Sequence, residues 1–538
     1  MLIYYPSHTY GMVTDFLSWL IKYETHGAEG LLTCFGYPGL HHFFHAINFS
    51  IFSIIGKSFL GWYIILSAMH GFNAFLLYML SRMWNSKFLK GRQSHIPLLA
   101  ALIFLVYPFH MEAVIWKACL HYLLTSCYLL SSIILWLRYL DTEKWKHVLM
   151  IHVLYLMALF TLELSFVFPM VFFFLSLYAW LENKDHSRFW RGIQRLVIPQ
   201  FLGLAIYFLL TRLAIGEFIG HYGAEKHLVY DPVIILNHGW NYLAKIFLFA
   251  HAWSFDMREW LYTDLFSKVY VTASLSFIVI CLTILALLKW DKLNASIRSS
   301  ILFLFVGTFC LAPIINLYFM WINTFENDRY NYLAACFLIL FVVYFTASFK
   351  TIKYLIPGAF FMISLFLFIK EIRYASQAGT VLHNLLNSFE YEDHQGAIYI
   401  LSIPENFQGM YMYRDYTDDA LVFRESLELF RDIKPKAEIV YLSQFNQMTV
   451  LDSIKFDPVE DGIFHVGFRQ HGNWFWRHGT GMSDYAKENY SLSLKAGYYR
   501  LEMDKIPENT LFLYPEAGIW KAYYPEPYIS KGPPAEGE

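Results

Sequence analysis

The sequence predicts an all-α polytopic membrane bundle followed by a C-terminal soluble domain of α/β to mainly β structure. Of its 538 residues, 57% are hydrophobic, 20% are aromatic and 16% are charged, and the mean hydropathy is +0.38. This composition is too apolar for an ordinary soluble protein. Long apolar runs recur up to residue 370, and shorter strand-like segments separated by Gly and Pro follow that point. The chain therefore divides into a membrane part and a soluble part.

Ten apolar runs in the first part are candidates for helices that cross a bilayer, which takes roughly 17–25 residues each. They lie near residues 59–81, 96–112, 118–138, 147–161, 165–182, 195–215, 269–289, 299–321, 331–349 and 353–370. The chain opens with an apolar stretch, residues 1–5, before the first of these runs. We expect this stretch to be the last turn of a first helix that is missing from the sequence. A protein whose N-terminus lies outside by nature is the alternative.

The distribution of basic residues predicts the orientation of the chain. Loops after the first, third, fifth, seventh and ninth runs carry most of the Lys and Arg, for example Lys184, Arg188 and Arg191 after the fifth. Basic residues mark cytoplasmic loops. Both ends then lie outside, which predicts a multi-pass protein of the cell inner membrane whose residues 371–538 face the periplasm or the exterior.

Two further apolar segments, 39–55 and 231–253, mix His and Asn into an aromatic face. This pattern suits helices that lie in the membrane interface. We therefore expect residues 1–58 to form a first outer loop with an amphipathic helix, residues 59–370 to form the bundle, and residues 371–538 to form the soluble domain. If 231–253 crossed the membrane instead, the C-terminal domain would be cytoplasmic.

The soluble part begins with a predicted βαβ-like unit. An amphipathic helix is expected at 376–389, strands at 397–402 and 438–443, and a helix between them at 417–430. The segments DGIFHVGF, SLSLKAGYYRLEM and NTLFLYP then predict mainly β structure, before a frayed Pro-rich end. The sequence contains no Walker loop, no GxGxxG and no GxSxG motif.

The stretch around which the membrane part is organised is YPFHMEAVIW, residues 107–116. Pro108 stops one helix, His110 and Glu112 follow at the lip, and the chain then enters the next apolar run. Ionisable groups at membrane depth cost roughly 2.5–3.5 kcal/mol on insertion scales, so they suggest a function when they line a cavity. A hairpin turn whose polar residues are merely solvated is the alternative.

Other outer loops contribute acids and a base: Asp15, Glu163, and the adjacent Asp328 and Arg329. Each has a structural alternative. Asp15 could be a solvated acid, Glu163 a hairpin cap, and Arg329 a helix-end charge paired to Asp328. The three histidines of LHHFFHAIN are expected to be interfacial residues rather than ligands.

Several function classes are disfavoured by the composition. The net charge of −2 and the pI of about 6.9 argue against nucleic-acid binding. The six cysteines form no CxxC motif, and the His and acid spacing enforces no metal site. The sequence indicates no particular cofactor, and a divalent cation remains open.

YPFHMEAVIW is similar to the HP-x-H-x-EAV segment of GT-C membrane glycosyltransferases, in particular the transmembrane O-mannosyltransferases that carry TPR repeats and their bacterial relatives. Three more stretches resemble family motifs in the same order. GMVTDF resembles the first-loop acidic motif, LELSFVFP the KE-x-x-x-x-x-P segment, and NDRYNYLAA the ERY-x-YLP segment. The resemblance covers residues 1 to about 350.

The chain departs from these motifs at several positions. The acidic pair of the first loop appears as Asp15 followed by Phe16, and Leu162 replaces the Lys before Glu163. Leu120 and Tyr122 stand where the family has Arg and Asp after its EAV segment. The TPR domain is replaced by the α/β to β domain.

The resemblance implies transfer of a sugar from a polyprenyl-phosphate donor to a protein, lipid or glycan acceptor on the extracytoplasmic face. Asp15 is then the expected base, with Glu112 as a second catalytic residue. Arg329, His110 and Glu163 are the expected donor-binding residues. The prenyl chain would lie in the apolar groove between the amphipathic helices and the bundle.

Two other function classes stay open. A transporter or flippase for a lipid-linked glycan would use intramembrane acids for passage of substrate or protons. Alternatively, the membrane part is an anchor and the C-terminal domain binds polysaccharide, with Trp474 and Trp476 as stacking surfaces. A place in the β-domain core also explains both tryptophans.

Overall fold

The structure is a computed structural model that describes residues 2–91, 94–220, 229–317, 327–349, 351–415, 420–472, 474–477 and 480–529. The end of the predicted run 299–321 and the last residues of the Pro-rich tail lie outside this set. The chain forms two compact units. The helical unit contains His26–Gly56 and Gly61–Glu371, and the C-terminal unit contains Ile3–Thr25, Lys57–Leu60 and Ile372–Glu538.

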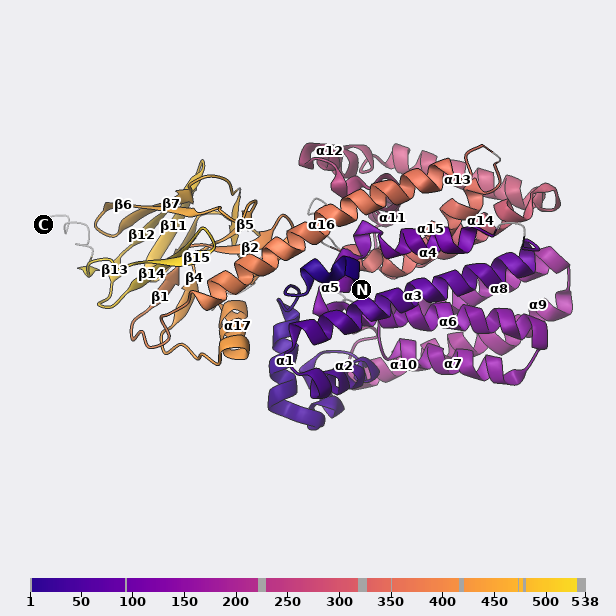
Figure 1. The fold of residues 1–538 in the computed structure, drawn as a ribbon, viewed down its shortest axis with the longest axis horizontal. Coiled ribbons are helices and arrows are strands. Elements are labelled where there is room, and N and C mark those ends of the chain that lie inside the picture. The colour runs from indigo at the N-terminus through magenta and orange to yellow at the C-terminus, as the bar shows by residue number, and fades with distance from the viewer. Residues whose placement is uncertain are drawn as a thin grey trace, which may run out of the picture. The chain divides into compact units, whose positions relative to one another are not determined.

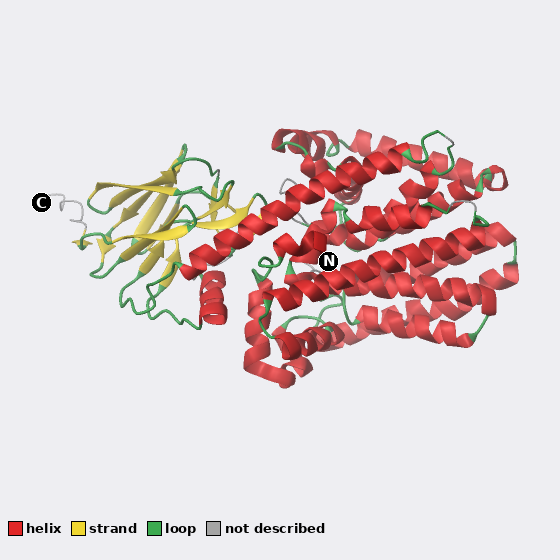
Figure 2. Ribbon diagram, in the orientation of Figure 1, coloured by secondary structure: helices red, strands yellow, loops and turns green. Residues whose placement is uncertain are grey.

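The helical unit is built from α-helices of different lengths, most of them apolar, which Figure 1 labels and Figure 2 shows in red. They are α2 (His42–Ile55), α3 (Phe59–Phe88), α4 (Ile96–Leu105), α5 (Met111–Ile115), α6 (Leu120–Thr142), α7 (Trp145–Leu159), α8 (Phe168–Asn183), α9 (His186–Gly192), α10 (Ile198–Ile215), α11 (Pro232–Leu248), α12 (Phe255–Glu259), α13 (Val269–Leu288), α14 (Ala295–Phe309), α15 (Asn331–Thr346) and α16 (Leu355–Asn387). The last of them, α16, continues into the C-terminal unit after Glu371.

The described residues contain seven helices long and apolar enough to cross a membrane, or eight if the bent pair α4 and Pro108–Ile115 counts as one span. This confirms in part the expectation of about ten. The two remaining predicted runs form the shorter apolar helices α7 and α14, of 15 residues each. The segment 39–55 forms the short apolar helix α2, and 231–253 forms α11 and the turn after it.

The helices of this unit differ strongly in how much of their surface is buried. In their most apolar windows, α6 is 89% buried and the helix Asp328–Thr346 is 83% buried, whereas α13 is only 6% buried. Close approach in the centre depends on small residues: a Cβ on Gly307 of α14 would lie 2.6 Å from Leu338 Cγ of α15. The exposed leucines of α13 would be costly in water, and they suit contact with hydrocarbon.

The local sequence explains where key helices begin and end. Asp231 caps α11 by accepting a hydrogen bond from the Val233 N–H at 2.8 Å, and Pro232 takes the first helical position. Pro108 lacks an N–H and disfavours helical geometry in the residue before it, so α4 ends at Leu105. The chain bends by 59° there.

The C-terminal unit is mainly β, as predicted, and α17 (Leu421–Arg431) is its helix between strands. Its strands, yellow in Figure 2, are β1 (Ile398–Ile400), β2 (Ile403–Phe407), β3 (Met410–Tyr411), β4 (Ile439–Tyr441), β5 (Gln444–Gln447), β6 (Ile454–Glu460), β7 (Ile463–Phe468), β8 (Phe475–Arg477), β9 (Thr480–Gly481), β10 (Tyr485–Lys487), β11 (Tyr490–Lys495), β12 (Tyr498–Met503), β13 (Lys505–Ile506), β14 (Leu511–Glu516), β15 (Ile519–Tyr523) and β16 (Tyr528–Ile529).

These strands form three main sheets, ordered β15-β14-β1-β4, β10-β11-β12-β7-β6 and β3-β2-β5-β8-β9. The predicted βαβ opening is confirmed, because β1 and β4 pair in parallel with Ile398 opposite Ile439 and α17 lies between them in the chain. Of the two candidate stacking residues, Trp476 is buried in the unit and Trp474 is 48% exposed.

The first part of the N-terminal segment, residues 3–25, belongs to the C-terminal unit. It contains nearly all of the short helix η1 (Leu2–Ser7) and of α1 (Asp15–His26). The Tyr10 hydroxyl donates to the Tyr411 carbonyl at 2.8 Å, and a ring nitrogen of His383 lies 3.1 Å from the Thr9 carbonyl. The compact units therefore divide the segment that the sequence assigned to a single outer loop, residues 1–58.

Candidate functional site

The break between α4 and α6 carries polar side chains into the interior of the helical unit. It consists of the turn η3 (Pro108–His110), the short helix α5 and the turn η4 (Lys117–Cys119). His110 and Lys117 are fully buried, and Glu112 is 5% exposed. The alternative in which these groups are simply solvated at a hairpin turn is therefore wrong.

Glu112 and Arg329 form a buried ion pair. Arg329 lies on the turn η12 (Asp328–Tyr330), and its backbone N–H donates to Glu112 Oε2 at 2.7 Å while its guanidinium donates to Oε1. The guanidinium carbon lies 5.0 Å from the centre of the Trp116 ring and 4.6 Å from that of Tyr330. Both carboxylate oxygens are thus held, which suits Glu112 to positioning Arg329.

The neighbouring Asp328 has different partners, so the alternative in which Arg329 pairs with Asp328 is wrong. Asp328 pairs with Lys245 of α11 and lies 3.2 Å from His251 Nδ1, in the turn η9 (Ala250–Ala252). All three side chains are buried. Burial and the adjacent Lys245 lower the pKa of His251 to about 4, which favours the neutral imidazole at neutral pH.

His110 lies in an aromatic layer behind these pairs. Its Nδ1 is 3.0 Å from the Phe104 carbonyl, and its ring packs on Tyr332 with centroids 4.6 Å apart. The next histidine, His70, lies 2.8 Å from the Tyr332 hydroxyl and holds that ring in place. One nitrogen of His110 thus has a backbone partner, whereas its buried Nε2 has no hydrogen-bond partner among the described residues.

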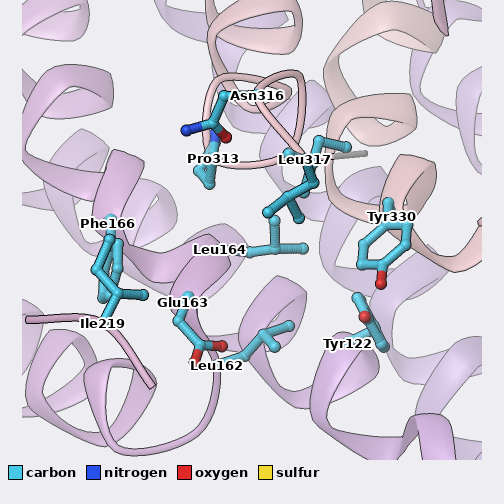
Figure 3. A pocket seen from close by; sticks show the side chains of 11 residues that line it. Tyr122, Leu162, Glu163, Leu164, Phe166, Ile219, Pro313, Asn316, Leu317 and Tyr330 are labelled. Carbon is cyan, nitrogen blue, oxygen red and sulfur yellow. The ribbon is translucent and has the colours of Figure 1, made fainter. Parts of the chain in front are cut away.

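A cavity of about 110 Å³ lies between Glu163, Tyr122 and Tyr330 (Figure 3). Its lining is mostly apolar, but it includes the polar side chains of Glu163, Asn316, Tyr122 and Tyr330. Figure 3 shows Glu163 on one side of the cavity and the two tyrosines on another. Tyr330 links the cavity to the ion pair, because its hydroxyl accepts a hydrogen bond from Arg329 Nη2 at 3.1 Å.

Glu163 is placed by a histidine that the sequence assigned to the membrane interface. Glu163 begins the turn η5 (Glu163–Val167) at the start of α8, and His41 Nε2 lies 3.3 Å from its Oε1. His41 and His45 are buried, so the interfacial expectation fails for both. Burial disfavours the charged form of His41, but Glu163 outweighs this effect and the pKa of His41 is raised.

Asp15 belongs to the C-terminal unit, whereas the other predicted site residues belong to the helical unit. It is the exposed first residue of α1. In that unit Ser18 donates to both oxygens of Glu425, at 3.0 and 3.1 Å. Burial, together with the nearby charges of Asp415 and Asp15, raises the pKa of Glu425 to about 7. The catalytic role of Asp15 stays a prediction.

Neither a protein-family model nor a curated protein sequence matches the chain. We therefore infer function from the geometry of these residues and from the motif resemblance. Across the described parts of the chain, no three His, Cys, Asp or Glu side chains come together as a metal site would require.

The sequence reasoning missed Lys245, His251 and Lys117. Lys117 is fully buried, its Nζ lies 6.0 Å from the centre of the Tyr63 ring, and it has no hydrogen bond or ion pair within the described residues. Each of the three had a signal in the sequence. Lys245 interrupts the apolar segment NYLAKIFL, His251 follows three residues after its end, and Lys117 directly follows EAVIW. A charge inside an apolar run implies a buried partner or a ligand.

Proposed function

We propose that the protein is a membrane glycosyltransferase of the cell inner membrane. It would move a sugar from a polyprenyl-phosphate donor to an acceptor on the extracytoplasmic face, where we also place residues 371–538. The observation that carries the proposal is a cavity bordered by a carboxylate and two tyrosines and joined through Tyr330 to the buried Glu112–Arg329 pair. Preorganised buried charges of this kind stabilise charge that develops during group transfer.

The reaction needs a base and an anion site. The acceptor oxygen attacks the anomeric carbon of the sugar, the bond from that carbon to the phosphate oxygen breaks, and the lipid phosphate leaves as an anion. A carboxylate accepts the proton of the acceptor hydroxyl. Within the helical unit, Glu163 borders the cavity and His41 holds it in place, so we assign it this role as the alternative to Asp15.

Cations near the site would hold the leaving phosphate. Arg329 is already paired with Glu112, and Lys245 with Asp328. Lys117 and Arg258 are also buried, and among the described residues neither has a carboxylate within 4 Å. A buried cation without a counterion is costly unless a ligand supplies the charge. A donor phosphate would supply this negative charge, and Glu112 would hold Arg329 in position.

A transporter for a lipid-linked glycan is the second candidate. The buried pairs could open and close a path for such a substrate. Against it, Glu112 and Asp328 are each engaged by basic partners at helix ends, and Glu163 lies at the start of α8 rather than in its middle. Enzymes that position a reacting lipid headgroup need fixed charges of this kind.

The deciding experiment is a transfer assay with membranes that contain the protein and a panel of labelled polyprenyl-phosphate sugars. Transfer to an endogenous or added acceptor, abolished by Arg329→Ala at unchanged expression, supports the enzyme. If no donor gives turnover and the purified protein moves labelled lipid-linked glycan across liposome membranes, the transporter is correct.

A further inference from the structure

A second cavity lies at the other end of the helices that border the first one. Its volume is about 260 Å³, and helices α8, α13 and α14 line it with side chains that are nearly all apolar. They include Phe174, Leu177, Leu181, Leu287 and Phe305, with Trp290 just beyond the end of α13. The cavity is a groove, because it is open to one side.

This groove is separate from the candidate site. Glu163 lies before the first turn of α8, while Leu181 lies 18 residues further along the same segment. At a rise of 1.5 Å per residue, this separation amounts to roughly 27 Å along the helix. The groove therefore lies at the end of the bundle where the sequence places the cytoplasmic side.

Two basic residues without acidic partners among the described residues lie close to the lining residue Trp290 in the chain. Lys289 and Lys292 flank Trp290 in the chain, both are exposed, and within the described residues neither has a carboxylate oxygen within 4 Å. The nearby basic residues Lys184 and Arg298 differ, because they pair with Asp291 at 3.3 Å and Glu182 at 2.7 Å. An unpaired positive edge beside an apolar groove is complementary to an anionic lipid.

We propose that this groove binds one acyl chain of an anionic phospholipid, with the phosphate of the headgroup at Lys289 and Lys292. The groove volume suits part of one chain, since sites for whole drug-sized ligands span about 300–1,000 Å³. The outer face of α13 supports this assignment: Leu282 is 61% exposed and Leu288 is 77% exposed, so this face suits contact with lipid. The proposal rests on the membrane-spanning part of the proposed function and not on the transfer reaction.

The test uses the purified full-length protein in lipid bilayers that contain spin-labelled phosphatidylglycerol or spin-labelled phosphatidylcholine. Electron paramagnetic resonance then measures the motionally restricted fraction of each lipid. We expect phosphatidylglycerol to bind more tightly, with about a fivefold contribution from each lysine. Lys289→Gln with Lys292→Gln should remove this preference, while Lys268→Gln, at the opposite end of α13, should leave it unchanged.

A second pair of variants tests the groove itself. Thr283 lines the groove, and Leu282 beside it faces outward. Thr283→Trp should fill the groove and lower the restricted fraction of both lipids, whereas Leu282→Trp should not. Equal binding of the two lipids by the native protein, or a preference that survives the double lysine substitution, overturns the proposal. Failure of the purified protein to enter bilayers overturns both the proposal and the membrane assignment. Loss of sugar transfer alone contradicts only the proposed enzymatic activity.

Discussion

Removal of one partner from the Glu112–Arg329 pair should destabilise the helical unit more than removal of both. Arg329 is 8% exposed and Glu112 is 5% exposed, so Arg329→Met leaves a buried carboxylate with only the backbone N–H of residue 329 as a partner. Breaking a buried ion pair in this way costs about 3–5 kcal/mol. The double variant Glu112→Gln with Arg329→Met has no buried charge at this position, and we expect it to regain at least about half of that loss.

Stability and sugar transfer are measured on the same samples, so that loss of folded protein is distinguished from loss of activity. Detergent-purified variants are compared by the midpoint of thermal unfolding, followed by intrinsic fluorescence, and by transfer from the labelled donor. The double variant should fold and remain inactive, because the reaction needs the guanidinium. Arg329→Lys keeps the charge but loses the two-point geometry, so it should retain part of the activity.

A matched control is available at the other end of the bundle. Arg298 pairs with Glu182 at 2.7 Å, and its side chain is 19% exposed. Arg298→Met should lower stability but leave transfer per folded protein unchanged. The reasoning is refuted if the double variant at Glu112 and Arg329 is no more stable than Arg329→Met alone, or if Arg329→Met transfers sugar at the native rate.

Three further predictions concern the candidate base, the C-terminal unit and the orientation of the chain. The Asp15→Asn variant should insert into the membrane normally. If Asp15 is the base, its turnover should fall by about 10²- to 10⁴-fold. Near-native turnover would assign the role of base to Glu163, and Glu163→Gln would then show the larger loss of turnover. Glu425 has its pKa raised to about 7 from a usual 4.5, so its protonated form is favoured in the folded state and stability falls as pH rises between these values. Glu425→Gln, which mimics the protonated form, should therefore raise the midpoint of thermal unfolding at pH 8 and leave it unchanged near pH 4.5. An equal effect of the substitution at both pH values would contradict the raised pKa of Glu425. A phosphatase fused after residues 371–538 should be active outside the cytoplasm, and an active cytoplasmic reporter in its place would reverse the orientation.

The helical elements could be predicted because the bilayer sets their length and composition. A span needs a run of apolar residues of nearly fixed length, and such runs are visible without any knowledge of packing. The bend at Pro108 and the βαβ opening at 397–443 follow from equally local signals. The N-terminal segment was harder, since its assignment to the C-terminal unit depends on contacts such as Tyr10 with Tyr411.

The partners of the buried charges could not be predicted. Glu112 and Arg329 are 217 positions apart, and nothing near either one indicates the other. The sequence favoured Asp328 as the partner of Arg329 because the two are adjacent, but adjacency does not imply contact. Glu163 likewise depends on His41, which the local pattern assigned to the membrane interface.

The geometry of the turn that carries Asp328 and Arg329 explains why these neighbours have different partners. In a 3₁₀ turn, with three residues per turn, successive side chains point about 120° apart. Asp328 therefore reaches α11 and Lys245, while Arg329 reaches α5 and Glu112. The Tyr107 hydroxyl also donates to the Ile246 carbonyl of α11 at 2.8 Å, so the α4–α6 break and α11 are joined twice. The Lys245–Asp328 pair therefore connects α11 to the turn that carries Arg329, and the hydrogen bond from Arg329 to Tyr330 extends this connection to the edge of the cavity.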